Sequence, residues 1–177
     1  MKKNILLIYT GGTIGMVRTE AGYAPRAGYL QSYLESLPAM RSDEMPNWEL
    51  LELCPLLDSS NMTVLDWNRI GGIIEEQYHR FDGFVVLHGT DTMAYTASAL
   101  SFSLENLDKP VVITGSQIPL FEVRNDGLDN LLTAIMIAAE GRVHEVSLCF
   151  SDKLLRGNRS VKLNATGLYA FSSPNYP

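Results

Sequence analysis

The feature that most constrains the fold of this chain is the alternation of short apolar runs with helix-length amphipathic segments. The apolar runs predict strands at Asn4–Tyr9, Glu49–Leu53, Phe84–Leu87, Val111–Thr114 and Val146–Phe150. Several lack polar alternation, which is typical of strands covered on both faces. The segments between them predict helices at Tyr29–Leu37, Val64–Arg80, Met93–Leu104 and Leu128–Glu140. We therefore expect an α/β fold, a doubly wound and mainly parallel sheet with helices on both faces.

Length and composition fit a single domain that spans residues 1–177. An apolar fraction of 46% with 19% charged residues excludes a disordered chain. The formal net charge of −6 argues against nucleic acid as a partner, because proteins that bind it usually carry a basic excess. The sequence contains no apolar stretch of membrane-spanning length, so we expect no membrane contact.

The two cysteines predict neither a disulfide framework nor a zinc site. Cys54 and Cys149 are far apart in the chain and belong to no CxxC pair. We expect two reduced, buried thiols in a cytoplasmic protein. The start Met1-Lys2-Lys3 is like that of a signal peptide, but the apolar run Ile5–Tyr9 is too short for one.

Polar segments rich in hydroxyl groups follow all five predicted strands. In open α/β sheets, ligands bind beyond the carboxyl ends of the strands. These segments are Thr10–Gly15, Asp58–Asn61, His88–Thr92, Gly115–Gln117 and Ser151–Lys153. Their convergence on one rim of the sheet predicts a site there.

The first of these segments has two interpretations. Glycines after a strand let backbone N–H groups converge on a phosphate or an oxyanion, with Thr13 as a nucleophile among them. A plain glycine turn is the simpler alternative. The dinucleotide fingerprint is incomplete, and Met16–Thr19 followed by Gly22 favours a hairpin over a helix.

A threonine hydroxyl is a weak nucleophile and needs a base beside it. His88 is a candidate by type, but it closes an apolar strand, where a structural histidine is the commoner case. Lys162 follows the loop-like stretch Arg156–Arg159; it is either a surface lysine or a desolvated base. The sequence has no GxSxG elbow, which argues against a serine hydrolase.

Several of these polar residues also fit roles in helix capping. Thr63 and Asp66 form a capping-box pattern, and Asp126 is expected to cap the last helix in the same way. Thr90–Thr92 fits an N-cap, or alternatively a carboxylate that faces an ammonium group or a lysine. Asp58–Asn61 fits a polar turn.

Taken together, these motifs resemble one known family. Tyr9–Gly15 and His88–Met93 resemble the two signature segments of bacterial-type L-asparaginases. Asp58–Met62, Gly115–Pro119 and Arg156–Lys162 are similar to those of its type I, cytoplasmic branch. The resemblance covers essentially the whole chain in the right order.

The resemblance implies hydrolysis of L-asparagine to L-aspartate and ammonia without metal or cofactor. It implies that Thr13 attacks the side-chain amide and forms an acyl-enzyme. Tyr23 would lie on a mobile loop that closes over the substrate and would assist proton movement. Thr90, Asp91 and Lys162 would form a second cluster.

The same resemblance implies the substrate-binding residues. Asp58, Ser59 and Ser60 match the segment that binds the α-carboxylate and α-ammonium groups of the substrate, and Thr90 and Asp91 would contact it too. Asp91 would hold the α-ammonium group.

Family members carry a second, smaller α/β domain and assemble as homo-oligomers, with each site completed by the C-terminal domain of a neighbouring subunit. By that pattern, residues 172–177 are expected to start the linker to such a domain, and residues 1–177 alone to be weakly active or inactive. Three alternatives remain open: an accessory subunit of a tRNA-dependent amidotransferase, a nucleotide-binding domain, and a non-catalytic folding or interaction fragment.

Overall fold

A computed structural model describes residues 2–20 and 22–176 of the chain. Its centre is a six-stranded sheet in the order β4-β1-β5-β6-β7-β8. The first five strands in this order are parallel, and β8 pairs antiparallel with β7. The bounds are β1 (Asn4–Gly11), β4 (Asn47–Leu57), β5 (Gly83–Leu87), β6 (Val111–Thr114), β7 (Val146–Phe150) and β8 (Lys153–Arg156). The α/β class predicted from the sequence is confirmed.

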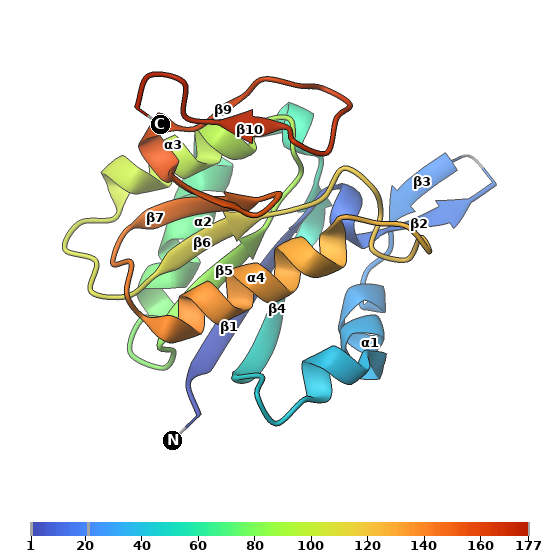
Figure 1. Ribbon diagram of the computed structural model, residues 1–177, viewed down its shortest axis with the longest axis horizontal. Helices are drawn as coiled ribbons and strands as arrows, with labels where there is room; N and C mark the ends of the chain where they lie inside the picture. Colours follow the sequence, from blue (N-terminus) through green and yellow to red (C-terminus); the bar gives the residue numbers. More distant parts are fainter. Residues whose placement is uncertain (1, 21, 177) are drawn as a thin grey trace.

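Helices cover both faces of this sheet (Figure 1). Their bounds are α1 (Tyr29–Ser36), α2 (Val64–Gln77), α3 (Met93–Ser103) and α4 (Gly127–Glu140). One core packs the sheet against α2 and α3, and the other packs it against α1 and α4. Successive side chains of a strand point to opposite faces, so Leu6 and Ile8 enter the first core, whereas Ile5 and Leu7 enter the second.

The strand order decides where a site can form. After β1 the chain adds β4 on one side, and then crosses back to add β5, β6 and β7 on the other side. The order therefore reverses between β1 and β5. In doubly wound sheets, loops diverge at such a switch point and leave a crevice at the carboxyl ends of the strands. The segments that follow β1 and β5 begin with Gly12 and His88.

Most elements lie where the apolar pattern predicts them. Strand β4 runs further than the predicted Glu49–Leu53 in both directions, while α2 ends at Gln77 rather than at Arg80. The predicted hairpin is confirmed: β2 (Met16–Thr19) and β3 (Gly22–Pro25) pair antiparallel. Four 3₁₀ helices connect other elements of the described chain; they are η1 (Thr13–Gly15), η2 (Pro38–Arg41), η3 (Ser59–Asn61) and η4 (Gly157–Arg159).

Three short strands near the end of the chain were not predicted. Ser151 and Asp152 take left-handed backbone conformations, which reverse the chain tightly into β8. Strands β9 (Val161–Lys162) and β10 (Phe171–Ser172) then form a separate two-stranded ribbon. Ser172 therefore lies in a strand and Pro177 lies outside the described residues; the assignment of 172–177 to a linker stays a prediction.

Among the expectations about single residues, two need correction: the helix cap at Asp126 and the burial of Cys54. The Thr63–Asp66 box is present, and the Asp66 carboxylate accepts the Thr63 N–H at 2.8 Å. Asp126, however, makes no side-chain cap on α4, because its carboxylate accepts the backbone N–H groups of Gln117 and Ile118 near the start of the same loop. Cys149 is buried, which raises its pKa to about 11, whereas Cys54 is exposed and not buried as expected. Both thiols are free.

Among the described residues, no helix is long and apolar enough to cross a membrane.

Candidate active site

The segments after β1 and β5 touch each other through glycines. A Cβ atom on Gly12 would lie 2.4 Å from the backbone of Gly89, and one on Gly89 would lie 2.4 Å from the Ser59 hydroxyl oxygen. Gly12 also has a φ of +86°, which side chains other than glycine rarely adopt. Only residues without a side chain let these strand ends approach so closely. Thr13 and Thr90, each one residue further along, are thereby brought to the same rim of the sheet.

Lys162 completes a cluster with Thr90 and Asp91. Its Nζ donates to Thr90 Oγ1 at 2.9 Å and to Asp91 Oδ1 at 3.0 Å. The Lys162 side chain is 17% exposed, whereas that of Asp91 is 63% exposed. Lys162 is therefore not a solvated surface side chain, and its role as a base stays a prediction. Asp91 faces a lysine and caps no helix, as the sharper interpretation of Thr90–Thr92 required.

Thr13 and Tyr23 stand apart from this cluster. Thr13 starts η1 and is partly exposed, and among the described residues its hydroxyl has no hydrogen-bond partner. Tyr23 lies on β3, is 48% exposed, and donates its hydroxyl to Glu122 Oε1 at 2.6 Å. That hydrogen bond raises the pKa of Tyr23 above its ordinary value. The structure thus holds Tyr23 on Glu122 rather than on Thr13.

The segment after β4 packs against the segment after β5. Asp58 Oδ1 accepts the Ser60 N–H at 2.9 Å and so caps η3. Ser59 is buried, and its carbonyl accepts the Thr92 hydroxyl at 2.7 Å. Among Asp58, Ser59 and Ser60, Ser59 therefore contacts the segment that carries Thr90 and Asp91. For Asp58, the structure shows the polar-turn geometry.

His88 is a structural residue in this fold, which is the commoner case for a histidine that closes an apolar strand. It is fully buried; Nδ1 lies 2.6 Å from the Gly89 carbonyl, and Nε2 lies 2.8 Å from Thr96 Oγ1. Trp67 Nε1 donates to the same Thr96 oxygen at 3.0 Å. A carbonyl only accepts, so Nδ1 carries the proton and Nε2 accepts from Thr96. Burial lowers the pKa of His88 to about 4, which keeps the ring neutral.

Sequence reasoning missed the residue that ties the rim together, Gln117. Its Oε1 accepts the Thr90 hydroxyl at 2.8 Å, and its Nε2 donates to the carbonyls of Ala165 and Gly167 at 3.0 and 3.1 Å. Asp126 fixes the loop of Gln117 by accepting its backbone N–H at 3.0 Å. Gly115–Gln117 is predicted as a polar segment after a strand. Nothing in the local sequence, however, indicates the contact of Gln117 with Thr90 or its contacts with the carbonyls of residues 165 and 167.

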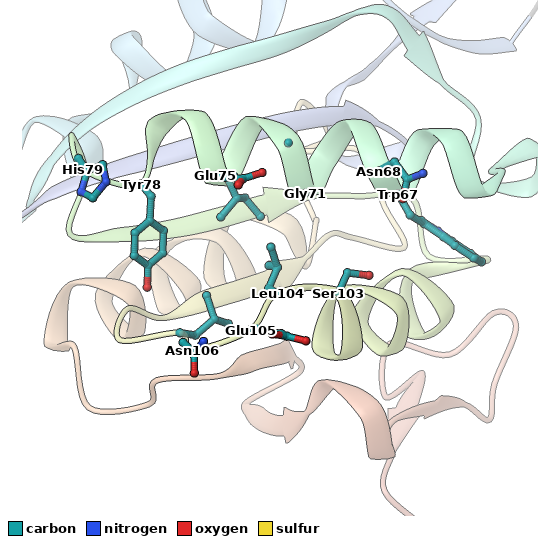
Figure 2. Close-up of a pocket in the computed structure, with 13 residues that line it drawn as sticks. Trp67, Asn68, Gly71, Glu75, Tyr78, His79, Ser103, Leu104, Glu105 and Asn106 are labelled. Atoms are coloured by element: carbon teal, nitrogen blue, oxygen red, sulfur yellow. The ribbon is translucent and has the colours of Figure 1, made fainter.

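A groove of about 550 Å³ lies elsewhere, between α2 and the segment 104–107 that follows α3 (Figure 2). Trp67, Glu75 and Glu105 line it, and none of the site residues predicted from the sequence does. The candidate site is therefore defined by its side chains, at the rim. Among the described residues, no group of three or more His, Cys, Asp or Glu side chains could hold a metal ion.

This geometry defines a class: a doubly wound α/β domain with a Thr–Lys–Asp cluster at its switch point. Residues 4–177 match the family model described as Asparaginase, N-terminal, and the chain belongs to the asparaginase family. The resemblance to type I L-asparaginases is confirmed by a relative named L-asparaginase 1, from Escherichia coli (strain K12). That relative is 56% identical over 176 residues, which cover 99% of this chain and 52% of the relative.

Solved structures agree with this assignment. The crystal structure of L-asparaginase I from Vibrio cholerae O1 biovar eltor str. N16961 matches with a TM-score of 0.93 and 52% identity, over 100% of this chain and 53% of that one. A more distant relative, named as one of the subunits of the glutamyl-tRNA(Gln) amidotransferase of Methanopyrus kandleri, is 33% identical over 96% of this chain and 39% of its own length. The chain spans about half the length of the asparaginases that it matches.

Proposed function

We propose that this chain carries the reacting groups of an amidohydrolase that converts L-asparagine to L-aspartate and ammonia. The observation that supports this most strongly is the contact of Lys162 Nζ with Thr90 and Asp91, at 2.9 and 3.0 Å. An amine, a hydroxyl and a carboxylate at one switch point provide a proton carrier, a polar contact for the reacting group and an anion for a cationic substrate amine.

Thr13 is the proposed nucleophile. Its oxygen would attack the side-chain amide carbon to form a tetrahedral intermediate, and its proton would pass to the leaving nitrogen. The C–N bond would then break, which releases ammonia and leaves an ester. Water would then cleave the ester and release aspartate. Backbone N–H groups after Gly12 are suited to the oxyanion that forms in each step. Tyr23 would assist the proton transfer, for which it must leave Glu122, its partner at 2.6 Å.

The substrate would be held from two sides. Asp91 is 63% exposed, so its carboxylate is available to the α-ammonium group while it still pairs with Lys162. Asp58, Ser59 and Ser60 would complete the contacts to the α-carboxylate and α-ammonium groups. The exposure of Asp91 and of Tyr23 also supports a site that is open to water as it stands.

We further propose that the assembled protein is a cytoplasmic homo-oligomer whose sites are completed by a neighbouring subunit. Two free cysteines support a reducing compartment. By this proposal, the 177-residue chain turns over asparagine far more slowly than a relative of full length.

The test measures ammonia release from L-asparagine and L-glutamine, together with calorimetric binding of L-aspartate. Thr13→Ala and Lys162→Met should abolish the release, and Lys162→Met should also weaken aspartate binding. The matched controls are Thr133→Ala and Lys2→Met, both at exposed positions away from the rim. If the unmodified chain shows no turnover and also does not bind aspartate, the proposal is contradicted. Unchanged rates in Thr13→Ala or Lys162→Met would remove that residue from the mechanism.

The second candidate is an accessory subunit of a tRNA-dependent amidotransferase. The match to a relative named as such a subunit favours it, and the net charge of −6 argues against direct tRNA contact. Retention of labelled tRNA at about 150 mM salt, a concentration that weakens non-specific binding, would support it.

A further inference from the structure

Hydrogen-bond partners hold the side-chain amide of Gln117 in one orientation. Its Nε2 faces two carbonyl oxygens, those of Ala165 and Gly167, at 3.0 and 3.1 Å. A flipped amide would place its oxygen against both carbonyls, so that three acceptors would meet without a proton. The amide nitrogen therefore stays on the carbonyls, and the amide oxygen faces Thr90.

This orientation decides where the Thr90 proton points. Gln117 Oε1 can only accept, so the Thr90 hydroxyl donates to it across 2.8 Å. Lys162 Nζ, at 2.9 Å, donates to one lone pair of the same oxygen. Among the described residues, the second lone pair of Thr90 Oγ1 has no partner. It is the remaining hydrogen-bonding capacity of this hydroxyl.

We infer that Gln117 is a positioning residue that makes Thr90 an acceptor, and never a donor, toward the bound substrate. The inference rests on the proposed function for the identity of that substrate. An acceptor at this position is satisfied by the N–H₂ group of a carboxamide. A carboxylate offers only acceptors at neutral pH, so it meets the Thr90 lone pair without a proton between them. Gln117 thereby favours the amide substrate over the acid product.

Lys162 and Asp91 do not account for a change in this discrimination between variants at position 117. Both are present in every variant compared and pair with each other at 3.0 Å in the structure, so we expect their attraction for either ligand to be common to these variants. When the acceptor at 117 is removed, the Thr90 hydroxyl can rotate and donate to a carboxylate. The ratio of the two affinities therefore reports on the direction of the Thr90 proton.

The first experiment needs no ligand. The chain has three glutamines, and Gln77 lies on α2 with its Oε1 on Arg80. In the ¹⁵N-labelled protein, with Gln117→Met to assign the signals, the Gln117 side-chain N–H₂ protons should exchange with water roughly tenfold or more slowly than those of Gln77. Exchange as fast as at Gln77 would overturn the inference.

The second experiment measures binding of L-asparagine and L-aspartate in the Thr13→Ala background, which prevents turnover. Adding Gln117→Met should shift the affinity ratio toward aspartate by roughly tenfold. Gln77→Met, the matched control, should leave the ratio unchanged. An equal weakening of both ligands would mean that Gln117 only supports the loop, and would overturn the inference. If neither ligand binds the Thr13→Ala chain, the proposed function has failed, while the exchange measurement still decides the orientation of Gln117.

Discussion

Thr13 and Thr90 follow neighbouring strands of one sheet, but their surroundings differ. Thr90 is buried, and its hydroxyl is held by Lys162 and Gln117 at 2.9 and 2.8 Å. Thr13 is partly exposed, its hydroxyl has no partner in the described chain, and it leads into a two-stranded hairpin. One half of the rim is thus fixed by hydrogen bonds before any ligand arrives. The other half leads into the β2–β3 hairpin, whose residues are exposed or partly exposed, and such segments open at low free-energy cost.

The difference shows how a single switch point can combine a rigid part and an adaptable part. The rigid part grows from buried strands and is tied to a distant loop through Gln117. The adaptable part carries Tyr23, whose partner Glu122 lies on the loop between β6 and α4, the loop that also carries Gln117. The backbone contact between Gly12 and Gly89 joins the two parts.

The largest expected effect comes from breaking that contact. Gly12→Ala should lower the free energy of unfolding by about 3 kcal/mol or more, because the new Cβ meets the Gly89 backbone at 2.4 Å and the φ of +86° is strained. Urea denaturation followed by circular dichroism measures the change. Gly72→Ala is the control: nothing lies within 4 Å, so it should stabilise α2 by about 0.5–1 kcal/mol. A neutral Gly12→Ala would mean that the two segments do not touch.

The next largest effect is a pH dependence of stability that arises from His88, which lies two positions before Thr90. His88 is neutral when folded, with a pKa of about 4 against an ordinary 6.5, so below pH 6.5 the unfolded chain binds a proton that the folded chain does not. Stability is therefore complete above pH 6.5 and falls as the pH drops toward 4. Between pH 7 and 5 we expect a loss of roughly 2 kcal/mol. Urea midpoints across this range, compared with those of His88→Gln, isolate the contribution, and equal slopes in both proteins would contradict it.

A smaller effect follows from removing the hydroxyl that holds His88. Thr96→Val keeps the shape of the side chain but leaves His88 Nε2 and Trp67 Nε1 without their shared partner. We expect a loss of about 1–2 kcal/mol in the free energy of unfolding, measured by tryptophan fluorescence in urea. Thr133→Val, exposed on α4, is the matched control. If both variants behave alike, the buried network contributes no stability.

The smallest effect is on the hairpin. In Glu122→Gln, the pKa of Tyr23 should fall toward its ordinary value, because the charged acceptor that stabilises the neutral phenol is gone. The ¹³Cζ resonance of Tyr23, followed through an alkaline titration, measures the shift. Glu44→Gln, on an exposed loop, should leave it in place. An unmoved Tyr23 titration in Glu122→Gln would show that the two groups do not interact in solution.

The sequence predicts the buried part of this fold well, for a physical reason. Strands such as Gly83–Leu87 and Val111–Thr114 are buried along their whole length, so their apolar runs mark them directly. The end of the chain lacks this signal. Strand β9 has two residues, and it pairs with β10 nine positions further on, so its formation depends on a partner and not on its own composition.

The candidate site also has a part that the sequence predicts and a part that it does not. Residue types and strand ends bring Thr90 and Asp91 to the rim, and the contact with Lys162 fulfils the expectation that these groups meet. Gln117 could not be found in this way, because its partners depend on how the loop 163–170 folds back. Asp126 shows the opposite error: its position at a helix start predicts a cap, whereas its carboxylate accepts backbone N–H groups of residues 117 and 118 in the same loop.

The sheet has one long outer strand, β4, which pairs with β1 along one side. Its other side pairs with no strand among the described residues, and the unpaired edge of an eleven-residue strand is the kind of surface on which chains add edge to edge. Glu49 and Glu52 place charge along this border, and Pro55 withholds an N–H from it. These few side chains thus oppose the edge-to-edge addition of a second chain along this border.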